Sequence, residues 1–154
     1  MKLDQSIEFH IKTTSLALTR MYNQIAEEYG ITQTIGYILT YVHKEGTPST
    51  KLATDLGMKK SSLTRLLQKM EQDGCIIRKI ESNDKRVVKI YLTKKGVERK
   101  KIAKQKVLDF NQMILDNIEE KEWETFLKVS NIIKEVATNE EIRLKQIKNE
   151  QQNT

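Results

Sequence analysis

The stretch TPSTKLATDLGMKKSSLTRLLQKMEQDG, residues 47–74, decides the fold because it contains two short helical patterns around a glycine. The first pattern begins at Thr47-Pro48, a capping residue followed by a proline, and Gly57 ends it. The second begins at Lys59 or Lys60, carries apolar residues at helical spacing and ends before the final glycine. Two short helices joined by so tight a turn predict a helix-turn-helix motif.

A strand-like pattern follows this motif. In residues 75–80 and 87–92, β-branched residues alternate with charged ones, and the polar residues 81–85 between them favour a turn. The pattern predicts a β-hairpin, and Thr93 directly after it suits the cap of another helix. A helix-turn-helix followed by a two-stranded ribbon has the order of elements of a winged helix.

Amphipathic helices flank this region on both sides. Apolar residues recur at helical spacing in residues 4–28, from Thr32 to about Gly46, over roughly twenty-five positions after Thr93, and again from about Glu119. We therefore expect a mainly α fold with a small β-hairpin wing. The expected organisation is one domain at residues 1–138, with a winged-helix core at about 32–96, a helix-turn-helix motif at about 48–72, flanking helices at 4–28 and 97–138, and a polar tail at 139–154 that either frays or extends the last helix.

The positive charge of the chain is concentrated in the predicted winged helix. The formal net charge is +6, and residues 48–96 contain twelve Lys and Arg against five Asp and Glu, while the remainder carries a net charge of −1. This distribution is the electrostatic footprint expected of a surface that meets a polyanion. From charge alone, a solvated basic face is an equal alternative.

The sequence offers little support for catalysis or metal binding. Nucleophilic catalysis needs a nucleophile, a base and an orienting acid, and neither His10 nor His43 lies in such a motif. The two histidines and Cys75 lie in different predicted elements and make a poor zinc site. We therefore expect no enzyme activity, no metal site and no other cofactor.

The sequence favours the cytoplasm. No apolar run approaches the roughly 20 residues of a membrane-spanning helix, and the N-terminus has no signal-peptide core. We therefore expect a protein without membrane contact. Cys75 is the single cysteine, so no intrachain disulfide forms, which agrees with a reducing compartment.

The helix from Lys60 to Asp73 is the predicted reader of DNA, because the major groove admits an α-helix and displays a distinct pattern for each base pair. Its apolar stripe consists of Leu63, Leu66, Leu67 and Met70. Arg65, on the opposite side, is able to grip guanine with two hydrogen bonds. The hydroxyls of Ser61 and Ser62 suit base edges and phosphates, or they cap the helix. The predicted DNA-binding residues of the motif are Ser49, Lys51, Lys59, Lys60, Ser61, Ser62, Thr64, Arg65, Gln68 and Lys69.

The tip of the predicted wing carries Lys85 and Arg86. A basic tip suits the minor groove, where narrow A·T-rich segments concentrate negative potential and attract an inserted arginine. Asp84 is a poor DNA contact in its own right, so we expect it to pair with Arg86 and fix the shape of the tip. The alternative is a solvated hairpin turn with incidental charges.

Residues 47–96 resemble the DNA-binding region of the MarR family of bacterial transcription regulators. The wing signature of that family is an Asp and an Arg two positions apart, a strand ending in Leu-Thr, and a glycine three residues beyond the Thr. This signature is matched by Asp84, Arg86, Leu92, Thr93 and Gly96. The helix-turn-helix matches at Leu52, Ala53, Leu56, Gly57, Ser61, Ser62, Leu63, Thr64, Arg65, Leu66, Met70 and Gly74.

The resemblance implies a homodimer in which the N- and C-terminal helices interlock and two winged helices meet a pseudo-palindromic duplex operator. It also implies a repressor that a small molecule or an oxidant releases from DNA. The residues of the dimer interface are expected to include Ile7, Ile11, Trp123 and Phe126, with a place in the intrachain core as the alternative. The family layout also suggests an effector crevice near Arg20, Tyr37 and Tyr41, for an amphipathic anion.

Two residues depart from the family pattern. Lys59 occupies the position of the usual capping residue of the reading helix, so that the cap comes from elsewhere or Lys59 holds a phosphate. Cys75 lies before the wing, where the family has an apolar residue, and we expect it to pack in the interior. The alternative to a sequence-specific regulator is a weakly specific architectural or protein-interaction module with a basic face.

Overall fold

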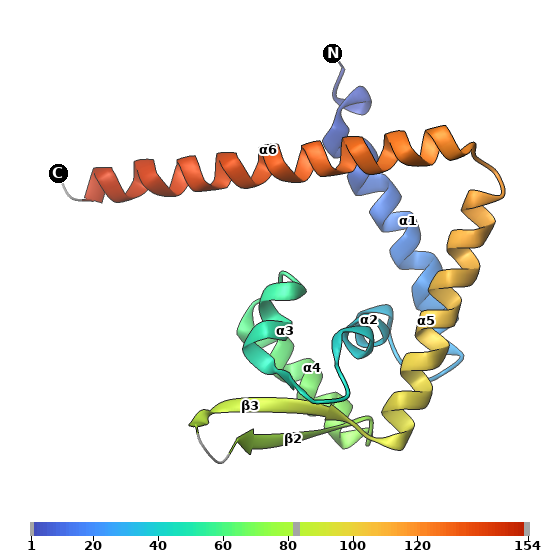
Figure 1. The fold of residues 1–154 in the computed structure, drawn as a ribbon, viewed down its shortest axis with the longest axis vertical. Helices are drawn as coiled ribbons and strands as arrows, with labels where there is room; N and C mark the ends of the chain where they lie inside the picture. The colour runs from blue at the N-terminus through green and yellow to red at the C-terminus, as the bar shows by residue number, and fades with distance from the viewer. Residues whose placement is uncertain (1, 82–83, 153–154) are drawn as a thin grey trace. The chain divides into compact units, whose positions relative to one another are not determined.

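The computed structural model describes residues 2–81 and 84–152, with the side chains of 81 and 84–86 left undescribed. The chain forms two compact units, residues 1–107 and 108–154. The elements (Figure 1) are a 3₁₀ turn at Leu3–Gln5, α1 (Ile7–Glu27), α2 (Gln33–Tyr41), β1 (Thr47–Pro48), α3 (Ser49–Asp55), α4 (Lys60–Gln72), β2 (Ile76–Glu81), β3 (Asp84–Leu92), α5 (Lys94–Leu115) and α6 (Glu120–Gln152). The prediction of a mainly α winged helix is confirmed.

Side-chain caps define the starts of the first two α-helices. Ser6 Oγ accepts a hydrogen bond from the amide of Phe9 at 3.2 Å, so α1 begins after Ser6 and not at Asp4 as predicted. Thr32 Oγ1 accepts from the amide of Ile35 at 3.3 Å, which confirms Thr32 as the cap of α2. A capping bond of this kind stabilises a helix by about 1 kcal/mol.

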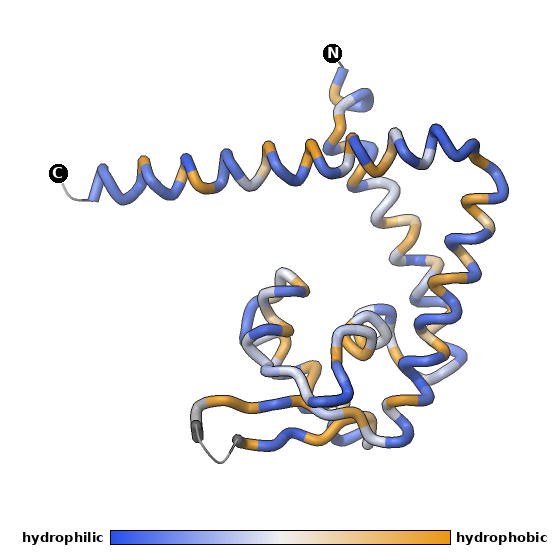
Figure 2. Tube along the Cα trace, in the orientation of Figure 1, coloured by the Kyte–Doolittle hydropathy of each residue, from blue (hydrophilic) through white to orange (hydrophobic). Residues whose placement is uncertain are grey.

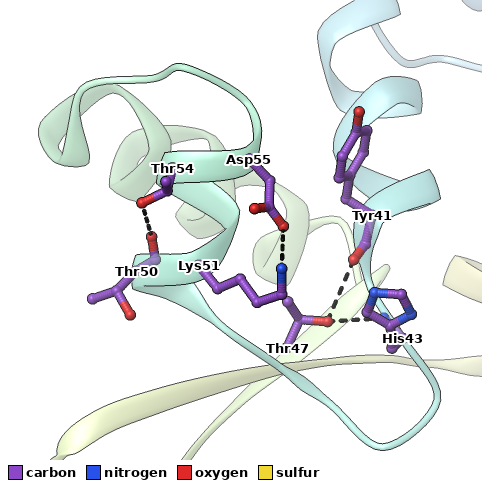
Figure 3. Close-up of polar contacts among 7 residues, drawn as sticks. All are labelled: Tyr41, His43, Thr47, Thr50, Lys51, Thr54 and Asp55. Carbon is purple, nitrogen blue, oxygen red and sulfur yellow. Dashed lines mark hydrogen bonds and ion pairs between the residues drawn. The ribbon is translucent and has the colours of Figure 1, made fainter. Parts of the chain in front are cut away.

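Thr47 has a different role from the predicted one. Its Oγ1 accepts from the amide of His43 at 2.9 Å and lies 3.4 Å from the carbonyl oxygen of Tyr41 (Figure 3). These bonds close α2 at Tyr41, so the predicted continuation to about Gly46 is wrong. Thr47 does not cap α3 either, because Pro48 takes the N-cap position.

The sheet contains a strand that the sequence did not reveal. β1 pairs antiparallel with β3, with Thr47 opposite Ile90, and β2 pairs with the other edge of β3, giving the order β1-β3-β2. The predicted two-stranded ribbon is therefore part of a three-stranded sheet in the described chain. Through β1, the start of α3 is attached directly to the wing.

The interior of the first unit is a single apolar cluster in which α2, α3, α4, β2 and β3 meet. The predicted inward stripe of α4 is confirmed, since Leu63, Leu67 and Met70 are buried and Leu66 packs partly buried against them. Cys75 is fully buried in the same cluster, as expected. Its other members are Ile35, Ile38, Leu39, Val42, Leu52, Ala53, Ile76 and Ile90.

The junction between β3 and α5 is closely packed. Thr93 Oγ1 accepts from the amide of Gly96 at 3.1 Å, which confirms the predicted cap, and the same hydroxyl donates to the carbonyl of Gly74 at 2.6 Å. Gly96 is buried, and a Cβ at this position would lie 2.0 Å from the carbonyl oxygen of Cys75. A side chain therefore has no room where α5 starts.

In the second unit, α6 is helical through Gln152, so residues 139–152 extend the helix instead of fraying. Ion pairs along it join Arg143 to Glu140 and Lys145 to Glu141, both at 2.6 Å. Apolar residues recur along most of its length (Figure 2), yet none of its described residues is buried. Within the described residues, no helix combines the length and the apolar character needed to cross a bilayer.

Candidate nucleic-acid interface

The outer face of α4 is a continuous polar surface. Ser61, Ser62, Thr64, Arg65, Gln68 and Lys69 are all exposed there. The buried residues of the same helix hold this face outward, because they alternate with it at helical spacing and anchor the helix in the core. The six predicted reading residues are thus brought together on one side of one helix.

The start of α4 leaves backbone amides available. Lys59 occupies the N-cap position in an extended conformation, and its side chain makes no capping bond. The amide of Leu63 donates to the carbonyl of Lys59 at 3.1 Å, so the amides of residues 60–62 precede the first helical bond. Such amides, together with the positive end of the helix dipole, favour an anion such as a phosphate oxygen. Ser61 and Ser62 lie within this first turn.

The hydroxyl of Thr64 is partly committed to the helix itself. Its Oγ1 donates a hydrogen bond to the carbonyl of Lys60 at 2.8 Å. Because the hydroxyl has only one proton, its lone pairs remain as acceptors toward any other group. Thr64 therefore suits a donor group, such as the amino group of an adenine or cytosine, and not a phosphate. The guanidinium of Arg65, in contrast, has hydrogen-bond donors only.

On α3, Lys51 and Asp55 form an ion pair, with Lys51 Nζ 2.7 Å from Asp55 Oδ2 (Figure 3). The pair lies one helical turn apart on the helix surface, where such pairs contribute a few tenths of a kcal/mol. Ser49, the first residue of α3, is half-buried. Lys51 thus offers its charge to an anion only in competition with Asp55.

The end of α4 is linked to the wing by a side-chain contact that the sequence analysis did not identify. Glu71 Oε2 accepts from Arg78 Nε at 2.8 Å and from Nη2 at 2.5 Å, and Glu71 Oε1 accepts from the Arg78 amide at 3.1 Å. These hydrogen bonds lower the pKa of the Glu71 carboxyl. The two residues are separated by a turn, so no helical or strand spacing signals the pair; their opposite charges on either side of Gly74 are the only hint.

The wing strands carry further cations. Lys79 Nζ lies 5.4 Å from the ring centroid of Tyr91. The predicted tip residues Asp84, Lys85 and Arg86 lie outside the described side chains, so their proposed contact and pairing remain predictions. The backbone of β3 begins at Asp84, opposite Glu81.

The predicted effector residues are distributed over α1 and α2. The hydroxyls of Tyr37 and Tyr41 are 3.0 Å apart, and this hydrogen bond is the main reason that the pKa of Tyr37 is raised. Arg20 is exposed on α1. A shallow open groove of about 580 Å³ also lies on α1, and its lining residues do not include these three; they are Glu8, Ile11, Lys12, Ser15 and Leu16.

The predicted interface residues are mostly exposed in the single chain. Ile7 is 57% exposed, Ile11 51% and Phe126 59%. Trp123 is half-buried and stacks on Phe126, with ring centroids 5.6 Å apart. None of the four belongs to the apolar cluster of the first unit.

No group of three or more metal-ligating side chains occurs in the part of the chain that the structure describes. Cys75 Sγ accepts a hydrogen bond from Arg99 Nη1 at 3.0 Å. The exposed outer face of α4 offers the hydroxyls of Ser61 and Ser62, the amide of Gln68, and the cationic groups of Arg65 and Lys69. This combination suits a polyanion whose bases present donors and acceptors.

The known proteins that this chain resembles in sequence are transcriptional regulators. A family model described as "Transcriptional regulator SarA/Rot" matches residues 20–104. The organic hydroperoxide resistance transcriptional regulator of Bacillus subtilis (strain 168) is 32% identical over 117 residues, which cover 75% of this chain and 76% of that protein.

Solved structures share the fold. The MarR protein from Peptoclostridium difficile DA00132 superposes with a TM-score of 0.82 at 21% identity, covering 90% of this chain and 92% of that one. MepR in the S. aureus MepR–DNA complex gives a TM-score of 0.77 at 20% identity, covering 86% and 97%.

Proposed function

We propose that this chain, which belongs to the SarA/Rot family of winged-helix transcriptional regulators, binds double-stranded DNA in a sequence-specific manner as a homodimer and represses transcription. The single observation that carries the proposal is the outer face of α4, where six polar side chains are exposed over a buried apolar stripe. The related protein MepR has been crystallised with DNA, which supports the same use of the fold here.

In this proposal α4 enters the major groove. Arg65 binds guanine through two hydrogen bonds, Gln68 reads an adjacent base, and Ser61 and Ser62 contact phosphates or base edges beside the open amides of the helix start. Lys59, Lys60 and Lys69 contact the phosphate backbone, as do Ser49 and Lys51 on α3. Lys85 and Arg86 follow the minor groove from the wing, with Asp84 as the pairing partner of Arg86.

The proposed dimer rests on the exposed apolar side chains of the long helices. Helix α6 spans 33 residues without one buried residue, and its exposed apolar side chains include Phe126, Leu127, Val129, Ile132 and Val136. So large an exposed apolar surface is unusual for a soluble monomer. A second copy would cover it, with Ile7, Ile11, Trp123 and Phe126 as interface residues. Twofold symmetry then matches a pseudo-palindromic operator with two half-sites.

The proposed regulation is release from DNA by a small molecule or an oxidant in a bacterial cytoplasm. Arg20, Tyr37 and Tyr41 are the proposed contacts of an amphipathic anion, because the paired phenols and the exposed guanidinium are able to bind a carboxylate. Benzoate is a suitable probe. It is expected to weaken operator binding in the wild type and to lose this effect in Arg20→Ala. Equal release from both proteins would refute this site.

The specificity of binding tests the central proposal. Operator candidates are first selected from a random duplex pool, and affinities for the selected duplex and a scrambled one are then measured by fluorescence anisotropy across a salt series. We expect a preference of at least ~10³-fold at physiological salt. Equal affinities would refute sequence-specific regulation and favour the alternative, a weakly specific architectural module whose basic face binds any duplex.

Sedimentation equilibrium tests the assembly. We expect a dimer at micromolar concentration, and Phe126→Glu is expected to shift it toward the monomer because a carboxylate is costly to bury. A folded wild-type monomer at micromolar concentration would refute the two-half-site arrangement.

A further inference from the structure

Glu71 and Arg78 connect the last turn of α4 to the middle of β2. The Glu71 carboxylate accepts three hydrogen bonds from Arg78, two from the guanidinium and one from the backbone amide. Both guanidinium bonds end on Glu71 Oε2, while Oε1 accepts the bond from the amide, so the two carboxylate oxygens are held by different parts of Arg78. The extra bond from the amide ties the carboxylate to the strand backbone itself. We call this three-bond contact the helix–wing brace.

The brace lies beside other bonds that fix the turn between helix and strand. The amide of Cys75 donates to the carbonyl of Met70 at 2.8 Å, and Lys95 Nζ donates to the carbonyl of Asp73 at 2.7 Å. These bonds hold the few residues of the turn. The brace reaches further, because it joins the last turn of the helix to a strand residue beyond the turn.

Small changes of the angle between α4 and β2 have large effects at the wing. From Arg78 to Glu81 the strand advances roughly 10 Å, at about 3.3 Å per residue. A tilt of about 10° at the brace would therefore displace the end of the ribbon by roughly 2 Å, two-thirds of a hydrogen-bond length. In the proposed function, α4 and the ribbon meet one rigid duplex at the same time. A displacement of this size is enough to break contacts that depend on both.

The charge of Glu71 argues against a direct role in binding. A carboxylate on the reading helix repels phosphates. Its pairing with Arg78 also neutralises one cation in residues 48–96, whose net positive charge favours DNA binding. Long-range electrostatics therefore predict that Glu71 weakens DNA binding. Geometry predicts the opposite, and this difference in sign makes the two explanations separable.

We propose that Glu71 and Arg78 are positioning residues, which touch no base or phosphate but hold α4 and the β2–β3 ribbon at the angle that one duplex requires. This inference rests on the proposed function, since it assigns the brace a part in DNA binding. It gives a positioning role to Glu71, a residue outside the predicted set of DNA contacts.

The test compares two substitutions that remove the same charge. Glu71→Gln breaks the ion pair of the brace, while Asp55→Asn breaks an ion pair within α3, where no second element is joined. Affinity for the selected operator is measured by fluorescence anisotropy from low to high salt. If the brace positions the wing, Glu71→Gln binds about tenfold more weakly and its salt slope falls by about 0.9 for each phosphate contact that is lost. Asp55→Asn is expected to bind as tightly as the wild type or more tightly, because it frees Lys51.

A binding affinity of Glu71→Gln equal to or higher than that of the wild type would overturn the inference. So would equal losses in the two variants, since these would indicate a general response to charge. Urea denaturation of both variants shows whether a loss of affinity reflects unfolding. The positioning role requires that Glu71→Gln bind the operator more weakly in the absence of urea, at a protein concentration at which both variants are fully folded.

Amide hydrogen exchange separates the brace from the DNA-binding proposal. In the DNA-free protein, Glu71→Ala is expected to raise the exchange rate of the Arg78 amide by about tenfold, because that amide loses its acceptor. An unchanged rate would refute the brace, whatever the DNA affinities. A wild type that does not distinguish the selected operator from a scrambled duplex would instead refute the proposed function.

Discussion

Replacing Gly96 by alanine is expected to destabilise the protein, although alanine is the better helix former. Gly96 is the third residue of α5 and is buried. An alanine Cβ would lie 2.0 Å from the carbonyl oxygen of Cys75 and 3.3 Å from Leu92 Cδ2. Because a backbone carbonyl cannot swing aside as the end of a side chain can, the starts of α5 and β2 would have to separate.

The magnitude follows from three contributions. Forcing an extra carbon into a packed interior costs about 1–3 kcal/mol. The separation also weakens two hydrogen bonds of Thr93, from its amide to the Cys75 carbonyl at 3.1 Å and from its hydroxyl to the Gly74 carbonyl at 2.6 Å, each contributing about 1 kcal/mol. The higher helix propensity of alanine offsets at most about 1 kcal/mol. The free energy of unfolding should therefore fall by about 2–4 kcal/mol.

Gly36→Ala is the matched control. Gly36 is also a buried helical glycine, but a Cβ there would lie 3.7 Å from Ala103 Cβ and 3.8 Å from Ile31 Cδ1, which are ordinary contact distances. Gly36→Ala should therefore stabilise the protein, by up to about 1 kcal/mol. Urea denaturation followed by circular dichroism, at one fixed protein concentration, measures both variants. If Gly96→Ala proved as stable as the wild type, or if both substitutions shifted stability in the same direction, the steric reasoning would be refuted.

Three further outcomes are expected. Thr93→Val should lower the free energy of unfolding by about 2 kcal/mol in urea denaturation, because it removes both side-chain bonds of the hydroxyl, whereas Thr93→Ser should retain most of the stability. Arg65→Ala should relax base preference at one operator position by about 1–3 kcal/mol when affinities for single-base variants of the operator are compared, while Arg86→Ala should weaken all duplexes alike. The pKa of Glu71 is lowered in the folded chain, so its contribution to stability is present above the ordinary glutamate pKa of about 4.3 and disappears as pH falls through the lower folded value. The stability difference between wild type and Glu71→Gln, at most about 1 kcal/mol for so exposed a pair, should therefore shrink between about pH 5 and pH 3; a pH-independent difference would count against the ion pair.

The helical features of the winged helix were predictable because their signals are local. The stripe of Leu63, Leu67 and Met70 repeats within one helix, and the caps at Thr32 and Thr93 act on amides three residues away. The exposed face of α4 follows directly from that stripe. A pattern of this kind needs no knowledge of distant residues, so sequence alone predicted where α4 lies and which of its faces is exposed.

The features that the sequence did not reveal depend on residues far apart. Thr47 looks like a helix cap in its own neighbourhood, but pairing with Ile90 makes it a strand residue whose hydroxyl closes α2. The contact of Glu71 with Arg78 likewise crosses a turn and follows no periodic rule. The end of α6 was open for a different reason, since the composition of residues 139–152 permits both a frayed and a helical tail; the structure has the helix.

The pairing of β1 with β3 also bears on the order in which the chain acquires its structure. Thr47 leaves the ribosome long before its partner Ile90, so β1 has no strand to join until the whole of α3, α4 and β2 has been synthesised. Contacts between such distant residues slow folding, because a long loop must close before they form. During synthesis, β1 is therefore expected to remain unpaired, and the sheet incomplete, until β3 has emerged from the ribosome.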